Sequence, residues 1–178
     1  TSATITKIWA DADNQDGIRP QNVTVTLLAD GVETDQKIVL EQANNWTGAF
    51  VDLDEYKDGI KIVYTVKETE ITGYTADISG DVENGFTVTN THTPETIDIE
   101  GSKTWNDNGD GSIRPSSITI NLLANGTVVD TKEVTATDNW TWKFEGKPKY
   151  ESGKEIKYTV SEVSVAGFIS SKGDGDYD

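Results

Sequence analysis

Apolar and polar side chains alternate with a period of two residues along much of the chain. The clearest runs are VTVTL at residues 23–27 and ITINL at residues 118–122, and IKIVYTVKE, EIKYTVSE and FTVTN continue the pattern. A period of two places successive side chains on opposite faces of a β-strand, whereas no window sustains the period of a helix. The pattern therefore predicts an all-β protein built from short, half-buried strands.

Tight-turn dipeptides separate these runs. They are Asp30-Gly31, Asp58-Gly59, Asn84-Gly85 and Asn125-Gly126. Asn-Gly and Asp-Gly readily adopt the positive φ angles that two-residue hairpin turns require. Short alternating strands joined in this way are typical of a β-sandwich, in which two sheets pack their apolar faces together.

The second half of the chain repeats the first. RPQNVTVTLLADG matches RPSSITINLLANG, and YTVKETEITGY matches YTVSEVSVAGF. The offset falls from 96 residues between Lys7 and Lys103 to 94 between Trp46 and Trp140, and such small deletions belong in loops. A repeat of about 95 residues is too long for a solenoid unit and indicates a duplicated domain. We expect one complete domain at residues 1–94 and a second at 95–178, joined by an extended linker.

Composition narrows the classes of function. The 178 residues carry 15 Lys and Arg against 31 Asp and Glu, a formal net charge of −16. Such a surface repels nucleic acid and anionic lipid, so we discount both as partners. The chain has no cysteine for a disulfide, and no apolar run approaches the roughly 20 residues of a membrane-spanning helix.

Each copy places a lysine two residues before a tryptophan, in the segments TKIW and SKTW, both predicted to be strands. Lys7 shares its strand face with Ile5 and Trp9, and Lys103 shares its face with Trp105. A solvent-facing lysine is the simplest interpretation. The tryptophans, which are expected to face a core, instead favour lysines that are buried.

Further polar residues fall on apolar strand faces. Glu68 shares a face with Tyr64 and Val66, Glu162 occupies the same place in the second copy, and Asn90 ends the closing strand FTVTN. Buried without partners, each such group would destabilise the fold by several kcal/mol. The groups must therefore form a hydrogen-bonded network or react with one another.

A family resemblance bears on this choice. In order along the chain, TKIWADADNQDGIRP, VTVTLLADG, NNWTGAF, YTVKETEITGY and FTVTNTHTP, and their second-copy counterparts, resemble the B-type repeats of Gram-positive collagen adhesins and pilins, the Cna B-type family. The resemblance implies two tandem inverse-immunoglobulin-like (prealbumin-like) β-sandwiches. In that family a first-strand lysine forms a spontaneous isopeptide bond with a last-strand asparagine, assisted by a glutamate. The motif positions give these roles to Lys7, Asn90 and Glu68, and to Lys103 and Glu162 in the second copy.

The resemblance also implies a structural role, as a stalk or shaft segment of a cell-wall-anchored adhesin or pilus outside the cell. Its partners would be neighbouring domains of the same surface protein. It implies no metal, no cofactor and no enzymatic turnover, because the reaction occurs once within each chain. The chemistry is coherent, since burial keeps an amine neutral and nucleophilic and keeps a carboxylic acid protonated, so that it can polarise an amide and move protons.

The second copy has no evident acceptor for Lys103. The 94-residue offset puts the equivalent of Asn90 beyond Asp178, so we expect the second domain to lack its last strand. Asp174, Asp176 and Asp178 could replace an asparagine chemically, but the alignment puts them in a loop. We therefore expect Lys103 to be unbonded within this chain, beside an open sheet edge that invites a strand from a neighbour or a peptide.

Two alternatives to the stalk stay open. One is a ligand-binding module for a host extracellular-matrix protein or glycan, and the other is a split domain that captures a peptide supplying the last strand. Trp142 is a candidate contact for a ligand because its counterpart is Gly48, so we expect it to be partly exposed. Trp46 and Trp140 occupy equivalent positions and are expected to pack in the two cores.

Acidic loops follow both lysine segments, DADNQDG at 11–17 and NDNGDG at 106–111. They suggest calcium, but neither fits an EF-hand, because Asp16 stands where glycine is required and Ser117 where glutamate is required. We interpret both as turns held by Asp and Asn side chains. His92 is the single histidine and lies at the junction, which argues against a catalytic triad or a histidine-based metal cluster.

Overall fold

A computed structural model describes residues 1–172, which divide into two compact units, unit 1 (Thr1–Pro94) and unit 2 (from Glu95). The strands of unit 1 are β1 (Ala3–Ala10), β2 (Asn22–Ala29), β3 (Val32–Glu41), β4 (Thr47–Phe50), β5 (Tyr56–Lys57), β6 (Ile60–Lys61), β7 (Tyr64–Glu68), β8 (Thr75–Asp81) and β9 (Gly85–Thr91). Those of unit 2 are β10 (Thr96–Ser102), β11 (Ser117–Ala124), β12 (Thr127–Thr135), β13 (Thr141–Pro148), β14 (Tyr150–Glu151), β15 (Lys154–Glu155) and β16 (Tyr158–Glu162). Three single-turn 3-10 helices, η1 (Gln42–Asn44), η2 (Gly111–Ile113) and η3 (Ala136–Asp138), complete the regular structure of this range. Within it, no helix has the length and apolar character needed to cross a membrane.

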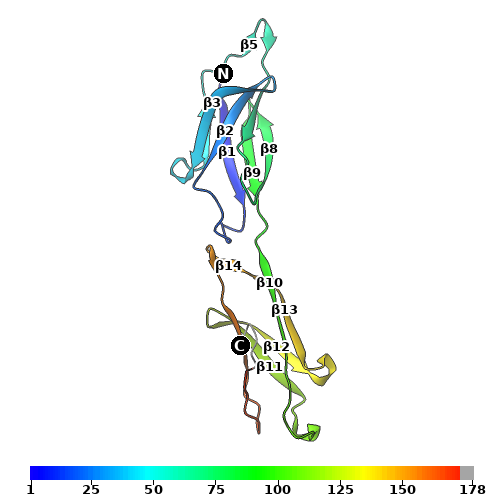
Figure 1. Ribbon diagram of the computed structural model, residues 1–178. Helices are drawn as coiled ribbons and strands as arrows, with labels where there is room; N and C mark the ends of the chain where they lie inside the picture. Colours follow the sequence, from blue (N-terminus) through cyan, green and yellow to red (C-terminus); the bar gives the residue numbers. More distant parts are fainter. Residues whose placement is uncertain (173–178) are drawn as a thin grey trace. The chain divides into compact units, whose positions relative to one another are not determined.

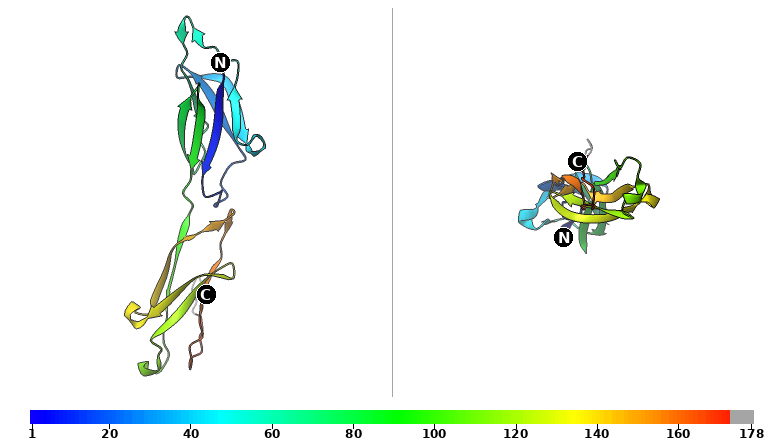
Figure 2. Two further views of the ribbon diagram at one scale, coloured as in Figure 1. Left: turned by 180° about the vertical axis from the view of Figure 1, so that it is seen from behind. Right: turned by 90° about the horizontal axis from the view of Figure 1, so that it is seen from below.

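Unit 1 is a sandwich of two sheets, one in the order β4-β1-β9-β8 and the other in the order β3-β2-β7. The first strand, β1, pairs in parallel with the last, β9 (Figure 1). Seen from behind, the blue β1 lies beside the green pair β9 and β8, with β9 between β1 and β8 (Figure 2). The parallel pair brings the two ends of the domain's sequence together inside one sheet.

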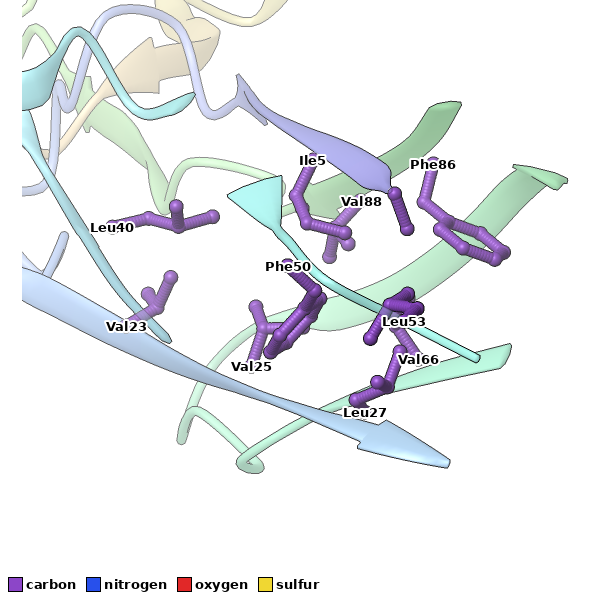
Figure 3. Packing of buried hydrophobic residues seen from close by; sticks show 11 residues of the cluster. Ile5, Val23, Val25, Leu27, Leu40, Phe50, Leu53, Val66, Phe86 and Val88 are labelled. Carbon is purple, nitrogen blue, oxygen red and sulfur yellow. The ribbon is translucent and has the colours of Figure 1, made fainter. Parts of the chain in front are cut away.

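The core of unit 1 lies between these sheets (Figure 3). Ile5, Phe86 and Val88 project from one sheet, and the alternating apolar residues of β2 project from the other. The predicted alternation is confirmed in the first half of β2, since Val23 and Val25 are buried and Thr24 between them is partly exposed; Thr26, at 7% exposed, departs from it. Each fully buried aliphatic side chain of this kind contributes about 1.5–3 kcal/mol.

Unit 2 repeats part of this arrangement. It has one sheet in the order β12-β11-β16, a pair β10-β13, and a core drawn from both. The core residues are Ile99, Ile118, Ile120, Leu122, Val134, Trp142, Phe144 and Tyr158. The prediction of an all-β fold with tandem sandwich units is thus confirmed. In the described part of unit 2, β10 pairs with β13 alone, whereas β1 of unit 1 has a neighbour on each side.

The prediction that SKTW lies in a strand is wrong, because β10 ends at Ser102, one residue before Lys103. Unit 1 explains the difference. Pairing of β1 with β4 stops at Thr6, and the segment from Lys7 to Ala10 is held in the sheet by β9. No described residue of unit 2 pairs with the equivalent segment, so the strand ends there.

The expectation that Trp142 is partly exposed is also wrong, since only 9% of its surface is accessible. Trp142 pairs in register with Gly101, and a Cβ on Gly101 would lie 2.3 Å from the indole ring. In unit 1 the equivalent pair is Ile5 and Gly48. The large residue of the pair is on the first strand in unit 1 and on the partner strand in unit 2. Because Gly101 has no side chain, the Trp142 ring has room in the core.

Candidate functional site

Three polar side chains of unit 1 are buried in its interior, on the facing sides of the two sheets. Lys7 on β1 is 5% exposed, Glu68 at the end of β7 is 8% exposed, and Asn90 on β9 is 1% exposed. Alternation along each strand turns all three inward with the apolar core residues. In the parallel pair, Lys7 stands opposite Val88 and Trp9 opposite Asn90, so Lys7 and Asn90 are diagonal neighbours, a spacing that a long side chain can span. Glu68 approaches from the other sheet.

These groups are close but poorly hydrogen-bonded. Lys7 Nζ lies 3.1 Å from a carboxylate oxygen of Glu68, yet the angles do not make that contact a hydrogen bond. Among the described residues, Lys7 Nζ, both Glu68 oxygens and Asn90 Oδ1 are buried without a hydrogen-bond partner. Folded proteins rarely leave such groups unsatisfied.

Burial also sets the ionisation of the lysine. Loss of solvation outweighs the attraction of Glu68 and holds the pKa of Lys7 below its ordinary range. Trp9 covers the amine, with its ring centroid 4.2 Å from Nζ. A dry amine with a lowered pKa, beside a carboxyl group and a carboxamide, has the components for aminolysis of an amide.

Unit 2 brings together Lys103 and Glu162, but differently. Lys103 Nζ lies 2.9 Å from one Glu162 oxygen and donates a hydrogen bond of 3.0 Å to the other. The side chains keep 18% and 10% of their surface accessible, against 0% and 2% for Lys7 and Glu68. Ser170 also donates to Glu162. The pair is therefore a partly solvated ion pair in which Lys103 Nζ and one Glu162 oxygen are hydrogen-bonded, whereas Glu162 Oε1 is still buried without a hydrogen-bond partner in residues 1–172.

A cleft of about 300 Å³ opens beside this ion pair, lined among others by Ile120, Trp142 and Val160. Ser102, the last residue of β10, also lines it, and in the described residues β10 has a strand neighbour on one side alone. The proposed alternative acceptors Asp174, Asp176 and Asp178 lie outside the described range.

A second buried polar cluster follows β1 and was not predicted. The carboxylate of Asp11 is 1% exposed and accepts hydrogen bonds from Arg19 Nε and Nη2 at 3.0 and 2.6 Å, from the Asn14 N–H at 3.0 Å and from the Tyr74 hydroxyl at 2.8 Å. The Arg19 hydrogen bonds lead this set in lowering the pKa of Asp11 to about 2. The guanidinium carbon of Arg19 lies 5.4 Å from the Trp9 ring centroid.

The ion pair of this cluster recurs in unit 2, where Arg114 binds Asp107 and its guanidinium carbon lies 5.7 Å from the Trp105 ring centroid, but Phe168 replaces Tyr74 and its hydroxyl. The signal in the sequence was the recurrence of Arg-Pro after each acidic loop. Each arginine thus forms an ion pair with the most deeply buried carboxylate of its acidic loop, Arg19 with Asp11 and Arg114 with Asp107. Among residues 1–172, no group of three or more His, Asp or Glu side chains is arranged to hold a metal ion.

His92 lies at the same end of unit 1 as the Asp11 cluster. Its Nδ1 lies 2.9 Å from the Gly73 carbonyl and its Nε2 lies 2.8 Å from Asp16. Both neighbours are acceptors, so the two hydrogen bonds together require the doubly protonated ring. Hydrogen bonding to Asp16, aided by the Gly73 carbonyl, accordingly raises the pKa of His92 above its ordinary value.

Unit 1 is therefore expected to lose stability as the pH rises from about 6 into the alkaline range. The folded pKa of His92 is raised, so its contribution is complete below the unfolded pKa of about 6.5 and is lost as the pH passes the folded value. We expect a loss of about 1 kcal/mol, measured by urea unfolding across this range. A His92→Gln variant should lack this slope, and parallel curves for both proteins would contradict the assignment.

Comparison with known proteins places the chain in a family. The model of the Cna protein B-type domain matches residues 3–91 and again residues 99–177. The collagen adhesin of Staphylococcus aureus is 45% identical over 173 residues, which cover 96% of this chain and 14% of that protein. The chain thus spans about one seventh of the adhesin's length.

A solved structure agrees. The crystal structure of two B repeat units, B1B2, of the S. aureus collagen-binding protein is 43% identical with a TM-score of 0.86, and the match covers 93% of this chain and 45% of that one. A single B1 unit is 36% identical with a TM-score of 0.48, over 94% of this chain and 87% of that one. B-type repeats are structural domains without enzymatic activity. The chain belongs to the Cna protein B-type domain family, with one such domain in each half.

Proposed function

We propose that this chain is a stalk segment of a Gram-positive surface adhesin or pilus, and that a self-formed isopeptide bond between Lys7 and Asn90 stabilises its first domain. The observation that carries the proposal is the buried set of Lys7, Glu68 and Asn90, in which Lys7 Nζ, both Glu68 oxygens and Asn90 Oδ1 have no hydrogen-bond partner within the described part of the chain. Left as separate groups they would destabilise the fold by several kcal/mol. Joining two of them into an amide removes the amine and consumes the carboxamide.

The reaction needs no outside reagent. The neutral Lys7 Nζ attacks Asn90 Cγ while a protonated Glu68 hydrogen-bonds the amide oxygen. Glu68 then delivers its proton to the leaving nitrogen and takes one from Nζ in return, the Cγ–Nδ2 bond breaks, and ammonia departs. Burial supplies the neutral amine and packing supplies the proximity.

The position of the bond suits a load-bearing segment. It would join β1 and β9, the first and last strands of unit 1. Force that enters one strand and leaves by the other would pass through the covalent link without peeling the sheets apart. Unlike a disulfide, an amide is not reduced.

Location and partners follow from the relatives. This chain resembles a collagen adhesin of S. aureus, so we place the segment outside the cell, anchored to the wall within a longer protein. Its immediate partners would be the neighbouring domains of that protein. Burial of Trp142 weakens the alternative of a ligand-binding surface at that residue.

Single-molecule stretching tests the stalk function. With the chain held by its two ends, unit 1 should not extend at forces that unfold unit 2, because the load bypasses its fold. An Asn90→Ala variant cannot form the bond, and its unit 1 should extend like unit 2. Equal extension of both units in the unaltered chain would contradict the proposal.

Strand acceptance by unit 2 is the second candidate. The observations that favour it are the unpaired side of β10 and the cleft beside Lys103 and Glu162. A peptide containing FTVTNTHTP should form a covalent adduct at Lys103 with loss of ammonia, and a Lys103→Arg variant should form none. A peptide that neither binds nor reacts would eliminate this candidate.

A further inference from the structure

Trp46 has an unusual backbone. Its φ is +58°, in the left-handed region, and Trp140 at the equivalent place in unit 2 has a φ of +56°. Asn tolerates this region, and Asn45 and Asn139 just before them also adopt it. For a bulky residue it is a true outlier, maintained only when the surroundings impose it. Its recurrence in two domains of differing sequence points to a shared purpose.

The strained residue reaches the lysine through its backbone. Its N–H donates to the Glu41 carbonyl at 2.9 Å, and its carbonyl accepts the Lys7 N–H at 2.8 Å. Trp140 makes the same two bonds, with Thr135 at 3.1 Å and Lys103 at 2.8 Å. The left-handed turn thus aims a carbonyl at the lysine just beyond the last register pair of β1 and β4, Thr6 and Thr47.

The ring of Trp46 reaches the same lysine through Trp9. The two indoles meet edge to face, with centroids 5.1 Å apart and planes at 79°, and Trp9 lies 4.2 Å from Lys7 Nζ. Trp140 and Trp105 repeat this contact at 5.1 Å and 72°. Trp46 is only partly buried, so burial of its own ring does not by itself account for the strained backbone.

We propose that Trp46 is a positioning residue for amide formation between Lys7 and Asn90, fixing the Lys7 backbone by its carbonyl and holding Trp9 over the amine by its ring. The inference rests on the proposed function. The covalent step is unchanged: Lys7 Nζ bonds to Asn90 Cγ and ammonia leaves. Trp46 touches neither reacting atom and acts by keeping the amine placed and dry.

The test follows bond formation in newly made full-length chain. Cell-free synthesis is pulsed and then quenched in acid at intervals, and intact mass reports the loss of ammonia. We compare the unaltered chain with Trp46→Gly, which tolerates the left-handed φ but has no ring, and with Trp46→Phe, which keeps a ring. Folding is followed separately by protease protection of each Trp46 variant in a Glu68→Gln background that cannot link.

We expect Trp46→Gly to slow linkage about ten-fold or more while folding changes by less than about two-fold. Linkage in Trp46→Gly should also require a higher pH than in the unaltered chain, because a more solvated Lys7 amine keeps its proton. Trp46→Phe should recover most of the rate, and Trp140→Gly should leave it unchanged. Linkage of Trp46→Gly at the unaltered rate and pH midpoint, or slowing that only matches slower folding, would overturn the positioning role. If the unaltered chain never loses ammonia, the proposed function itself fails and this inference with it.

Discussion

Replacing Glu68 with glutamine is expected to prevent the loss of ammonia. After correction for the changed side chain, the variant should be heavier than the unaltered protein by the mass of one ammonia. Glutamine keeps the size of the buried group but cannot exchange protons between the amine and the amide. The reaction should therefore stop at the folded, unlinked state. Intact mass under denaturing conditions measures this directly.

The same variant should lose much of the stability of unit 1. The link would close a loop of 84 residues, counting Lys7 to Asn90 inclusive (90 − 7 + 1), and constraint of the unfolded chain by such a loop corresponds to about 4.5 kcal/mol. The uncompensated Lys7 adds to the loss. Urea unfolding of unit 1 gives the magnitude.

Glu162→Gln is the matched control for this prediction. Glu162 occupies the equivalent position, but Lys103 has no described acceptor beside it. The change should leave the intact mass deficit of one ammonia unaltered. If Glu68→Gln still shows that deficit, Glu68 does not take part in the reaction.

Replacing Asp11 with alanine is expected to destabilise unit 1 by about 3 kcal/mol. The change leaves Arg19 without its ion-pair partner. It also removes the acceptor for the Tyr74 hydroxyl and the Asn14 N–H. Breaking a buried ion pair typically costs about 3–5 kcal/mol. We take the low end because Arg19 keeps 21% of its side chain accessible. Thermal or urea unfolding of unit 1 provides the measurement.

Acid titration sharpens this second prediction. The pKa of Asp11 is lowered to about 2, so its contribution is complete above the unfolded pKa of about 3.9 and fades as the pH falls toward 2. The difference between Asp11→Ala and the unaltered protein should therefore shrink in acid. Asp13→Ala is the control. The Asp13 side chain is fully exposed and lies 3.9 Å from Arg19, so its replacement should change the free energy of unfolding by less than about 0.5 kcal/mol. Equal effects of the two substitutions would refute the role of the cluster.

The alternating pattern was enough to predict the sandwich and the inward face of the site. Lys7 shares its parity with Ile5, and both are buried; the same rule turns Glu68 inward with Val66. These outcomes depend on local geometry, because a strand has only two faces and the apolar residues select one.

What sequence could not predict depends on partners in space. The end of β10 before Lys103 reflects a pairing that no described residue of unit 2 supplies. Burial of Trp142 depends on Gly101, more than forty positions earlier in the chain. The Asp11 cluster joins two loops through Tyr74, and no local pattern of acidic residues distinguishes such a cluster from a metal loop.

Peptide mapping of the folded, unaltered chain is the most direct test of the central claim. After digestion, tandem mass spectrometry should find the Lys7 peptide joined to the Asn90 peptide by an amide with ammonia lost, and the Lys103 peptide unmodified. Free peptides carrying an intact lysine at 7 and an intact asparagine at 90, recovered from properly folded protein, would contradict it.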